Sequence, residues 1–86
     1  MQATHEIREG ARVNGSHGER LGVVDEVRKD EVSGVPASFV VKTGMWPLTK
    51  RKVLSVDVIR QVNNDPNTII VNVSKKELRG IPPLAG

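Results

Sequence analysis

The 86-residue chain contains no cysteine, and its aromatic residues are limited to Phe39 and Trp46. Without cysteine, neither a disulfide nor a thiolate metal site can supplement the core. The two histidines, His5 and His17, lie in polar surroundings, and two histidines without a third nearby ligand make a poor metal site. We therefore expect no metal and no cofactor, and no small-molecule substrate is indicated.

Long apolar runs are also missing. The first ten residues lack the basic start and apolar stretch of a secretory signal, and no segment is apolar for the length of a membrane span. These features predict a cytoplasmic protein with no transmembrane segment. Thirteen Lys and Arg against ten Asp and Glu give a formal net charge of +3, which permits an acidic partner without requiring one.

Short runs rich in valine and isoleucine, bounded by Gly, Asn, Asp and Pro, fill most of the chain and are typical of β-strands. Six such strands suggest a small closed or half-closed barrel, because closure removes exposed sheet edges. The expected strands are Ala11–Val13, Arg20–Arg28, Ala37–Thr43, Lys52–Ser55, Arg60–Val62 and Thr68–Val73, with a helical turn at Val56–Ile59, a polar turn at Lys29–Pro36 and a turn at Asn63–Asn67. Phe39 is expected to be buried, and Ile69, Val71 and Val73 to share one face.

One helix is predicted near the end of the chain. Ser74 precedes Glu77 by three residues, which is the spacing of a capping box. The helix S-K-K-E-L-R should end at Gly80. Because so short a helix is not stable alone, we expect Leu78 and Ile81 to dock on the barrel.

The stretch G-S-H-G-E-R-L-G has the G-x-x-G spacing of one class of nucleic-acid clamp. That clamp requires a helix on each side, whereas the flanking residues here are strand-like. No helix N-terminus follows that could receive a pyrophosphate. We interpret the stretch as a hairpin turn in which Asn14-Gly15 and His17-Gly18 supply positive φ angles.

Apolar residues in L-G-V-V-D-E-V recur every three positions, at Leu21, Val24 and Val27. This spacing fits neither simple alternation nor a helix. A bulged, strongly curved strand would reconcile it, and a glycine such as Gly22 often marks such a bend.

The loop T-G-M-W-P-L-T-K-R-K holds the only tryptophan, followed by three consecutive cations. Two interpretations remain open. The loop can anchor a protein partner through an apolar patch with a basic rim, or Trp46 can fold back as a lid over one end of the barrel. A dimer that buries Trp46 from both copies would satisfy both. The candidate partner-binding residues are Met45, Trp46, Leu48, Lys50, Arg51 and Lys52.

A second group of cations, Lys75, Lys76 and Arg79, lies on the predicted helix. If they lie near Lys50–Lys52, the two groups form one positive face able to meet phosphates or an acidic protein. The scarcity of aromatic residues for base stacking weakens the interpretation as an RNA-binding module.

Acidic residues cluster around the end of the second predicted strand, at Asp25, Glu26, Asp30 and Glu31. We interpret them as a solvated edge, since charged residues are mostly exposed. An enzyme would need an acidic pocket around Asp25 and Asp57, and no nucleophile–base–acid set is visible. The prediction is therefore a protein that is not an enzyme.

The order of these motifs resembles a PRC-barrel domain over Ile7–Pro83. The opening strand, turn and "G-x-V-x-D/E-V" segment of that family are matched by Gly15, Gly18, Gly22, Val24, Glu26 and Val27. Further similar segments are V-S-G-x-P-x-x-x-V-V at Val32–Val41, L-S-V-D-V-I at Leu54–Ile59 and the ending at Ser74–Pro82. Ser55 stands where the family prefers proline.

The resemblance implies an all-β, small SH3-like β-barrel with a short C-terminal helix, used as a binding module without catalytic residues. The domain would span residues 7–83, between a flexible N-terminus at 1–6 and a tail at 84–86. By this resemblance we expect a stand-alone bacterial adaptor. From the residues of the Met45–Lys52 loop, we expect it to bind a protein partner or itself through that loop. An RNA- or ribosome-associated module is the alternative, and some bacterial members resemble stress-associated proteins.

Overall fold

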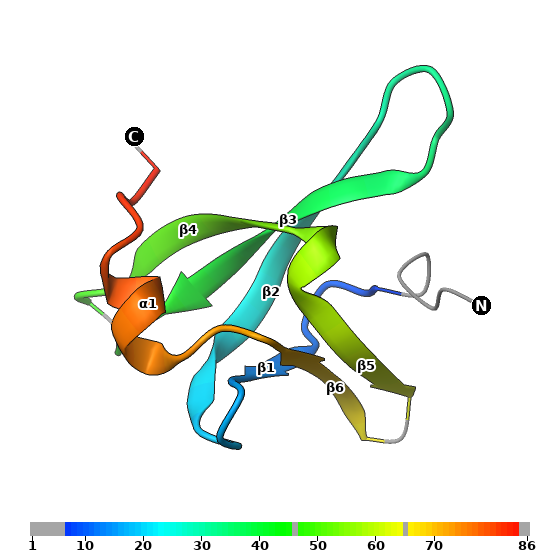
Figure 1. Ribbon diagram of the computed structural model, residues 1–86. Helices are drawn as coiled ribbons and strands as arrows, with labels where there is room; N and C mark the ends of the chain where they lie inside the picture. Colours follow the sequence, from blue (N-terminus) through cyan, green and yellow to red (C-terminus); the bar gives the residue numbers. More distant parts are fainter. Residues whose placement is uncertain (1–6, 46, 65, 85–86) are drawn as a thin grey trace.

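The computed structural model describes residues 7–45, 47–64 and 66–84, and these residues form a mostly-β fold (Figure 1). The 3₁₀ turn η2 (Val56–Val58) joins the fourth strand to the fifth, and the helix α1 (Lys75–Arg79) follows the last strand. The six strands are β1 (Arg12–Asn14), β2 (Arg20–Lys29), β3 (Pro36–Thr43), β4 (Lys50–Ser55), β5 (Ile59–Asn64) and β6 (Asn67–Val71). The predicted class, all-β with a short C-terminal helix, is confirmed.

The strands form one mixed sheet in the order β4-β3-β2-β1-β6-β5. β1 and β6 pair in parallel, with Val13 opposite Ile69, and the other neighbours pair antiparallel. In Figure 1 the strands curve around a common interior, α1 lies at one end, and the β2–β3 hairpin projects from the other. No helix in the described ranges is long and apolar enough to cross a membrane.

The interior is filled by aliphatic side chains around one aromatic ring. Phe39 is fully buried, as predicted, and Ile69, Val71 and Val73 are buried together along the last strand and its extension. Leu78 is buried from α1. The core residues are Ile7, Ala11, Val13, Leu21, Val24, Phe39, Val41, Leu54, Ile69, Val71, Val73 and Leu78, and Ile81 packs against them. The helix therefore docks on the core as expected.

The bulged strand predicted around Gly22 is present. Val24 pairs with Val41 and Glu26 with Val40, so Asp25 is an extra residue on β2. An extra residue shifts the alternation of side chains, and this is why apolar residues three positions apart can face the same core. A second register shift lies opposite the Val13/Asn14 step of β1.

The hairpin between β1 and β2 is confirmed, but its backbone differs from the expectation. Gly18 has a φ of +80°, whereas Asn14, Gly15 and His17 have no positive φ. The turn is closed by the N–H of Gly15, which donates to the carbonyl of Glu19 at 2.7 Å. The turn thus needs only one glycine with a positive φ, at Gly18, because the hydrogen bond between Gly15 and Glu19 already closes it.

Strand limits differ from the prediction at β4, which begins at Lys50 rather than Lys52, and at β6, which ends at Val71 rather than Val73. Lys50 and Arg51, expected in a loop, therefore lie on a strand. The turn expected at Asn63–Asn67 is narrower, because β5 continues to Asn64, which pairs with Asn67. Residues 1–6, expected as a flexible N-terminus, and residues 85 and 86 of the expected tail lie outside the described residues, as does Asp65.

Gly22 allows β2 and β3 to approach closely, and its replacement should destabilise the fold. A Cβ at Gly22 would collide with the carbonyl oxygen of Lys42 and approach the side chain of Val41 to 2.9 Å. We expect Gly22→Ala to lower the free energy of unfolding by about 1–3 kcal/mol, measured by urea denaturation.

The control is Gly80→Ala, where the nearest atom lies at 3.5 Å and φ is −75°. It should change stability by less than about 0.5 kcal/mol. Equal losses in both variants would contradict this account.

Candidate functional site

A pocket of about 440 Å³ lies between the β3–β4 connection and α1. Its walls combine two leucines with four cations, and no carboxylate of a described residue belongs to its lining. The lining residues are Thr43, Gly44, Leu48, Lys50, Lys52, Lys75, Leu78 and Arg79. A volume of this size is in the range of pockets that bind small groups. This pocket is the candidate binding site.

The alternation of side chains along β4 separates the three consecutive cations. Lys50 and Lys52 both line the pocket, whereas Arg51 between them faces the other side of the sheet. This follows from β-geometry, since successive side chains in a strand point to opposite faces. The basic run that the sequence presents as one group is therefore divided between two surfaces.

Lys52 is only 5 % exposed, although it was expected to contact a partner. Its Nζ donates to the carbonyl oxygens of Leu78 at 2.9 Å and Arg79 at 3.2 Å. A cation at the C-terminus of a helix satisfies carbonyls that lack partners within the helix. Lys52 thus joins β4 to the end of α1 and forms the inner wall of the pocket.

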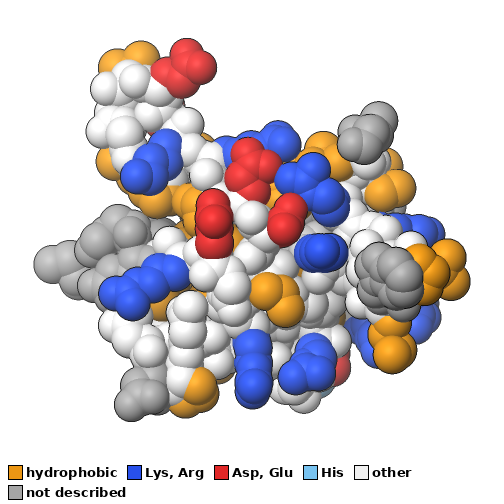
Figure 2. Space-filling view, turned by 180° about the vertical axis from the view of Figure 1, so that it is seen from behind, with side chains coloured by type: hydrophobic (Ala, Val, Ile, Leu, Met, Phe, Trp, Pro, Cys, Tyr) orange, Lys and Arg blue, Asp and Glu red, His pale blue; other side chains and the backbone are white. Residues whose placement is uncertain are grey.

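Arg51 is held by carboxylates on the outer face of the sheet. Its Nε donates to Asp25 at 2.8 Å and its Nη2 to Glu26 at 2.9 Å, while Arg28 lies 3.4 Å from Glu26. Since β3 lies between β4 and β2, the Arg51 side chain crosses the outer face of β3, where Val40 is fully buried. Figure 2 shows acidic and basic side chains gathered together on one face.

The acidic cluster expected as one solvated edge is also divided. Asp25 and Glu26 pair with Arg51, whereas Asp30 belongs to the turn of the β2–β3 hairpin. The backbone N–H groups of Ser33 and then Val32 hold the pKa of Asp30 below its ordinary value. Glu31 is exposed in the same turn, and Asp57 is exposed at η2.

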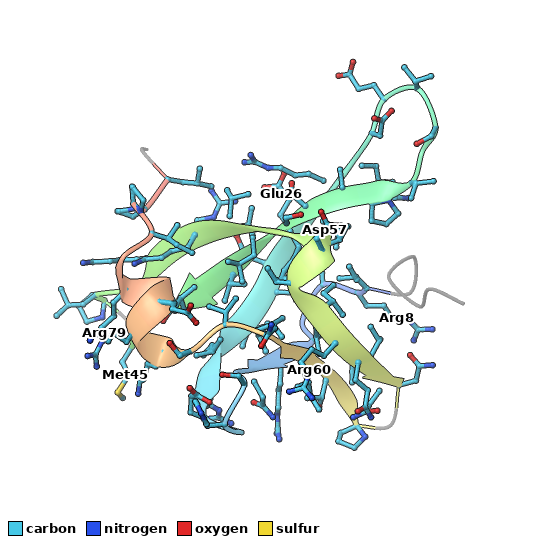
Figure 3. All side chains as sticks on the ribbon, in the orientation of Figure 1. Arg8, Glu26, Met45, Asp57, Arg60 and Arg79 are labelled. Carbon is cyan, nitrogen blue, oxygen red and sulfur yellow. The ribbon has the colours of Figure 1, made fainter. Side chains whose placement is uncertain are left out.

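Two exposed apolar side chains lie on the β3–β4 connection, and one of them, Leu48, lines the pocket. Met45 is 84 % exposed and Leu48 80 %, and the N–H of Leu48 donates to the carbonyl of Met45 at 2.7 Å. Trp46, expected either to anchor a partner or to fold back as a lid, lies outside the described residues. Figure 3 shows Met45 and Arg79 of α1 at the same end of the molecule, and Gly44, which precedes Met45, lines the pocket together with Arg79.

The two groups of cations named from the sequence meet only in part. Lys50 and Lys52 of the first group share the pocket with Lys75 and Arg79 of the second. Arg51 faces the other side of the sheet, where it pairs with Asp25 and Glu26, and Lys76 is exposed on α1 outside the pocket lining. The pocket is thus built from two strands, their connection and the helix.

Glu19 is a supporting residue that the sequence analysis did not identify. Its carboxylate accepts hydrogen bonds from the backbone N–H groups of His17 at 2.8 Å and Lys75 at 3.2 Å. Its own backbone N–H, followed by those of His17 and Lys75, lowers its pKa from the ordinary 4.5. Together with the capping box of Ser74 and Glu77, which is present as predicted, Glu19 positions the start of α1. No local pattern indicates a contact across 56 positions.

Within residues 7–45, 47–64 and 66–84, no group of three or more histidine, aspartate or glutamate side chains is arranged to hold a metal ion. The chemistry available at the pocket is attraction of an anion by Lys50, Lys75 and Arg79, next to apolar surface.

Replacement of Lys52 should loosen α1. Lys52→Met removes the ammonium group that donates to two helix carbonyls, while keeping an unbranched side chain of similar length. We expect the free energy of unfolding to fall by about 1–2 kcal/mol, measured by thermal and urea denaturation. Lys50→Met, on the same strand face but exposed, is the matched control and should have a smaller effect. An unchanged stability of Lys52→Met would refute the structural role of this lysine.

Acid should weaken the attachment of α1 through Glu19. Since folding lowers the pKa of Glu19, the charged carboxylate stabilises the fold above the unfolded-state pKa near 4.5, and this contribution is lost as the pH falls through the lower folded pKa. Glu19→Gln should therefore lower the melting temperature at pH 7 and have less effect near pH 3. Glu31→Gln, in the exposed hairpin turn, is the control. A pH-independent difference between wild type and Glu19→Gln would contradict the assignment.

Residues 8–78 match the family model of the PRC-barrel domain, which covers all six strands and most of α1. No curated protein matches the chain.

Proposed function

Because the chain belongs to the PRC-barrel domain family, whose domains are generally non-catalytic binding modules, we propose that it is an adaptor that binds a protein partner through the β3–β4 loop. The observation that carries this proposal is the position of Met45 and Leu48. Both are largely exposed, Leu48 lines the pocket together with four cations, and Met45 follows the lining residue Gly44 in the chain. Their side chains bury little apolar surface within the fold, and a partner would bury that surface.

This arrangement is typical of a protein interface. Scattered apolar residues on a surface need no explanation, whereas an apolar pair beside a hollow, with charged residues around it, has the centre and rim of an interface. Methionine is flexible and suits surfaces that adapt to a partner. Trp46 remains part of the proposal through its position between Met45 and Pro47.

The proposal assigns different roles to the six residues named from the sequence. Met45, Trp46 and Leu48 form the apolar centre, and Lys50 belongs to the basic rim. Arg51 and Lys52 support the loop from behind, because their charged groups already bind Asp25, Glu26 and the helix carbonyls. The partner can be a second copy of this chain, in which case both loops pack against each other.

RNA binding is the second candidate. It is favoured by the convergence of Lys50, Lys75 and Arg79 on one pocket. Against it, Phe39 is buried and offers no face for base stacking. Affinity dominated by phosphate contacts would also fall steeply with salt, whereas binding to an apolar loop would be less sensitive.

Replacement of both exposed apolar residues by serine should abolish partner binding. In pull-downs from host lysate with nuclease present, tagged wild-type protein should capture a partner that Met45→Ser/Leu48→Ser does not. Because both side chains are exposed, the double variant should keep the stability of the wild type. Trp46→Ala is expected to reduce capture as well.

Val32→Ser is the matched control, because Val32 is 98 % exposed at the tip of the β2–β3 hairpin, away from the loop. Sedimentation equilibrium of each variant tests the second-copy form of the proposal. If Met45→Ser/Leu48→Ser still captures the partner and its oligomeric state is unchanged, the role of the loop is refuted. Capture abolished by nuclease would support RNA binding instead.

A further inference from the structure

We infer that the pocket between the β3–β4 loop and α1 binds the side-chain carboxylate of an acidic residue in a peptide segment of a partner. Apolar residues flank this acidic residue in the peptide. This inference rests on the proposed function, since it names the chemistry of the partner that the loop would hold. It is carried by the charge, the depth and the surroundings of the pocket.

The positive charge of the pocket is not compensated within the described part of the chain. Arg51 and Arg28 both pair with carboxylates on the outer face. None of the ion pairs between described residues involves Lys50, Lys75 or Arg79, and all three are exposed. Their charges would therefore attract an incoming anion without first breaking an internal pair.

The inner end of the pocket is shaped for a small anionic group. Lys52 lines it while being 5 % exposed, and two of the three N–H groups of its ammonium donate to helix carbonyls. The third has no protein acceptor among the described residues. Leu78 beside it is buried, which limits water at this end. A carboxylate placed here would meet a fixed cation at the inner wall and mobile ones at the rim.

The surroundings favour a peptide over a nucleic acid as the source of the anion. Leu48 belongs to the pocket wall, and Met45 lies at the same end of the molecule as Arg79 (Figure 3). A peptide that alternates acidic and apolar side chains would use both the cations and this apolar surface. A phosphate backbone would use the cations alone and leave Met45 and Leu48 exposed to water.

The test uses the full chain labelled with ¹⁵N and followed by NMR. The probe is an acetylated and amidated peptide, Leu-Glu-Leu-Glu-Leu, and the comparison probe is Leu-Gln-Leu-Gln-Leu. The acidic peptide should shift the amide signals of the pocket residues Thr43, Gly44, Leu78 and Arg79. The uncharged peptide should bind at least about five-fold more weakly, since exposed ion pairs each contribute a modest attraction.

A matched pair of variants separates the pocket from general charge. Lys50→Gln/Arg79→Gln should weaken binding of the acidic peptide at least about five-fold. Lys29→Gln/Arg60→Gln removes the same charge from exposed positions on β2 and β5 and should leave the affinity within about two-fold. Equal effects of the two double variants would overturn the inference.

The remaining outcomes distinguish this inference from the proposed function. If the two peptides bind equally at Met45 and Leu48, the pocket assignment fails while binding by the loop stands. If neither peptide binds but Met45→Ser/Leu48→Ser still abolishes capture, the acidic-peptide chemistry is wrong and the adaptor role stands. If inorganic phosphate or a ten-nucleotide oligouridine binds the pocket more tightly than the acidic peptide, the anion comes from a phosphate and the inference is overturned.

Discussion

The buried ammonium group of Lys52 holds together the part of the protein on which the candidate site depends. It comes from β4 and binds the last carbonyls of α1, a helix of five residues that is too short to be stable alone. At the other end of the helix, Glu19 and the capping box satisfy the first N–H groups. Between them, Leu78 enters the core. The helix is thus attached by three contacts, and the pocket exists because α1 is held beside the β3–β4 loop.

The alternation of β4 explains why one run of cations serves two purposes. Arg51 joins Asp25 and Glu26 across the outer face, which neutralises that side and covers the sheet. Lys50 and Lys52 face the pocket, where Lys75 and Arg79 add further positive charge. Among the described residues, no carboxylate in the lining balances this charge. A net charge of +3 therefore understates how unevenly the charge is distributed. The cations of the outer face are paired with carboxylates, and this is why we propose the pocket as the surface that binds an anion.

Membership of the PRC-barrel family accounts for the framework, and the loop and helix at one end account for the proposed specificity. The bulged β2 curves the sheet so that a small aliphatic core can form around Phe39. Such a framework positions exposed connections rigidly, and binding residues are commonly found on connections of this kind. Met45 and Leu48 occupy that position here.

The sequence by itself determined the strands, the bulge at β2, the burial of Phe39 and the capped helix, because each depends on neighbouring residues. It placed the start of β4 two residues too late, since consecutive lysine and arginine residues are uncommon in strands. The pairing of Arg51 with Asp25 and Glu26, and of Lys52 with α1, was decided only by the tertiary structure. These contacts join residues about 26 positions apart, and no local pattern specifies which distant group a charged side chain will meet.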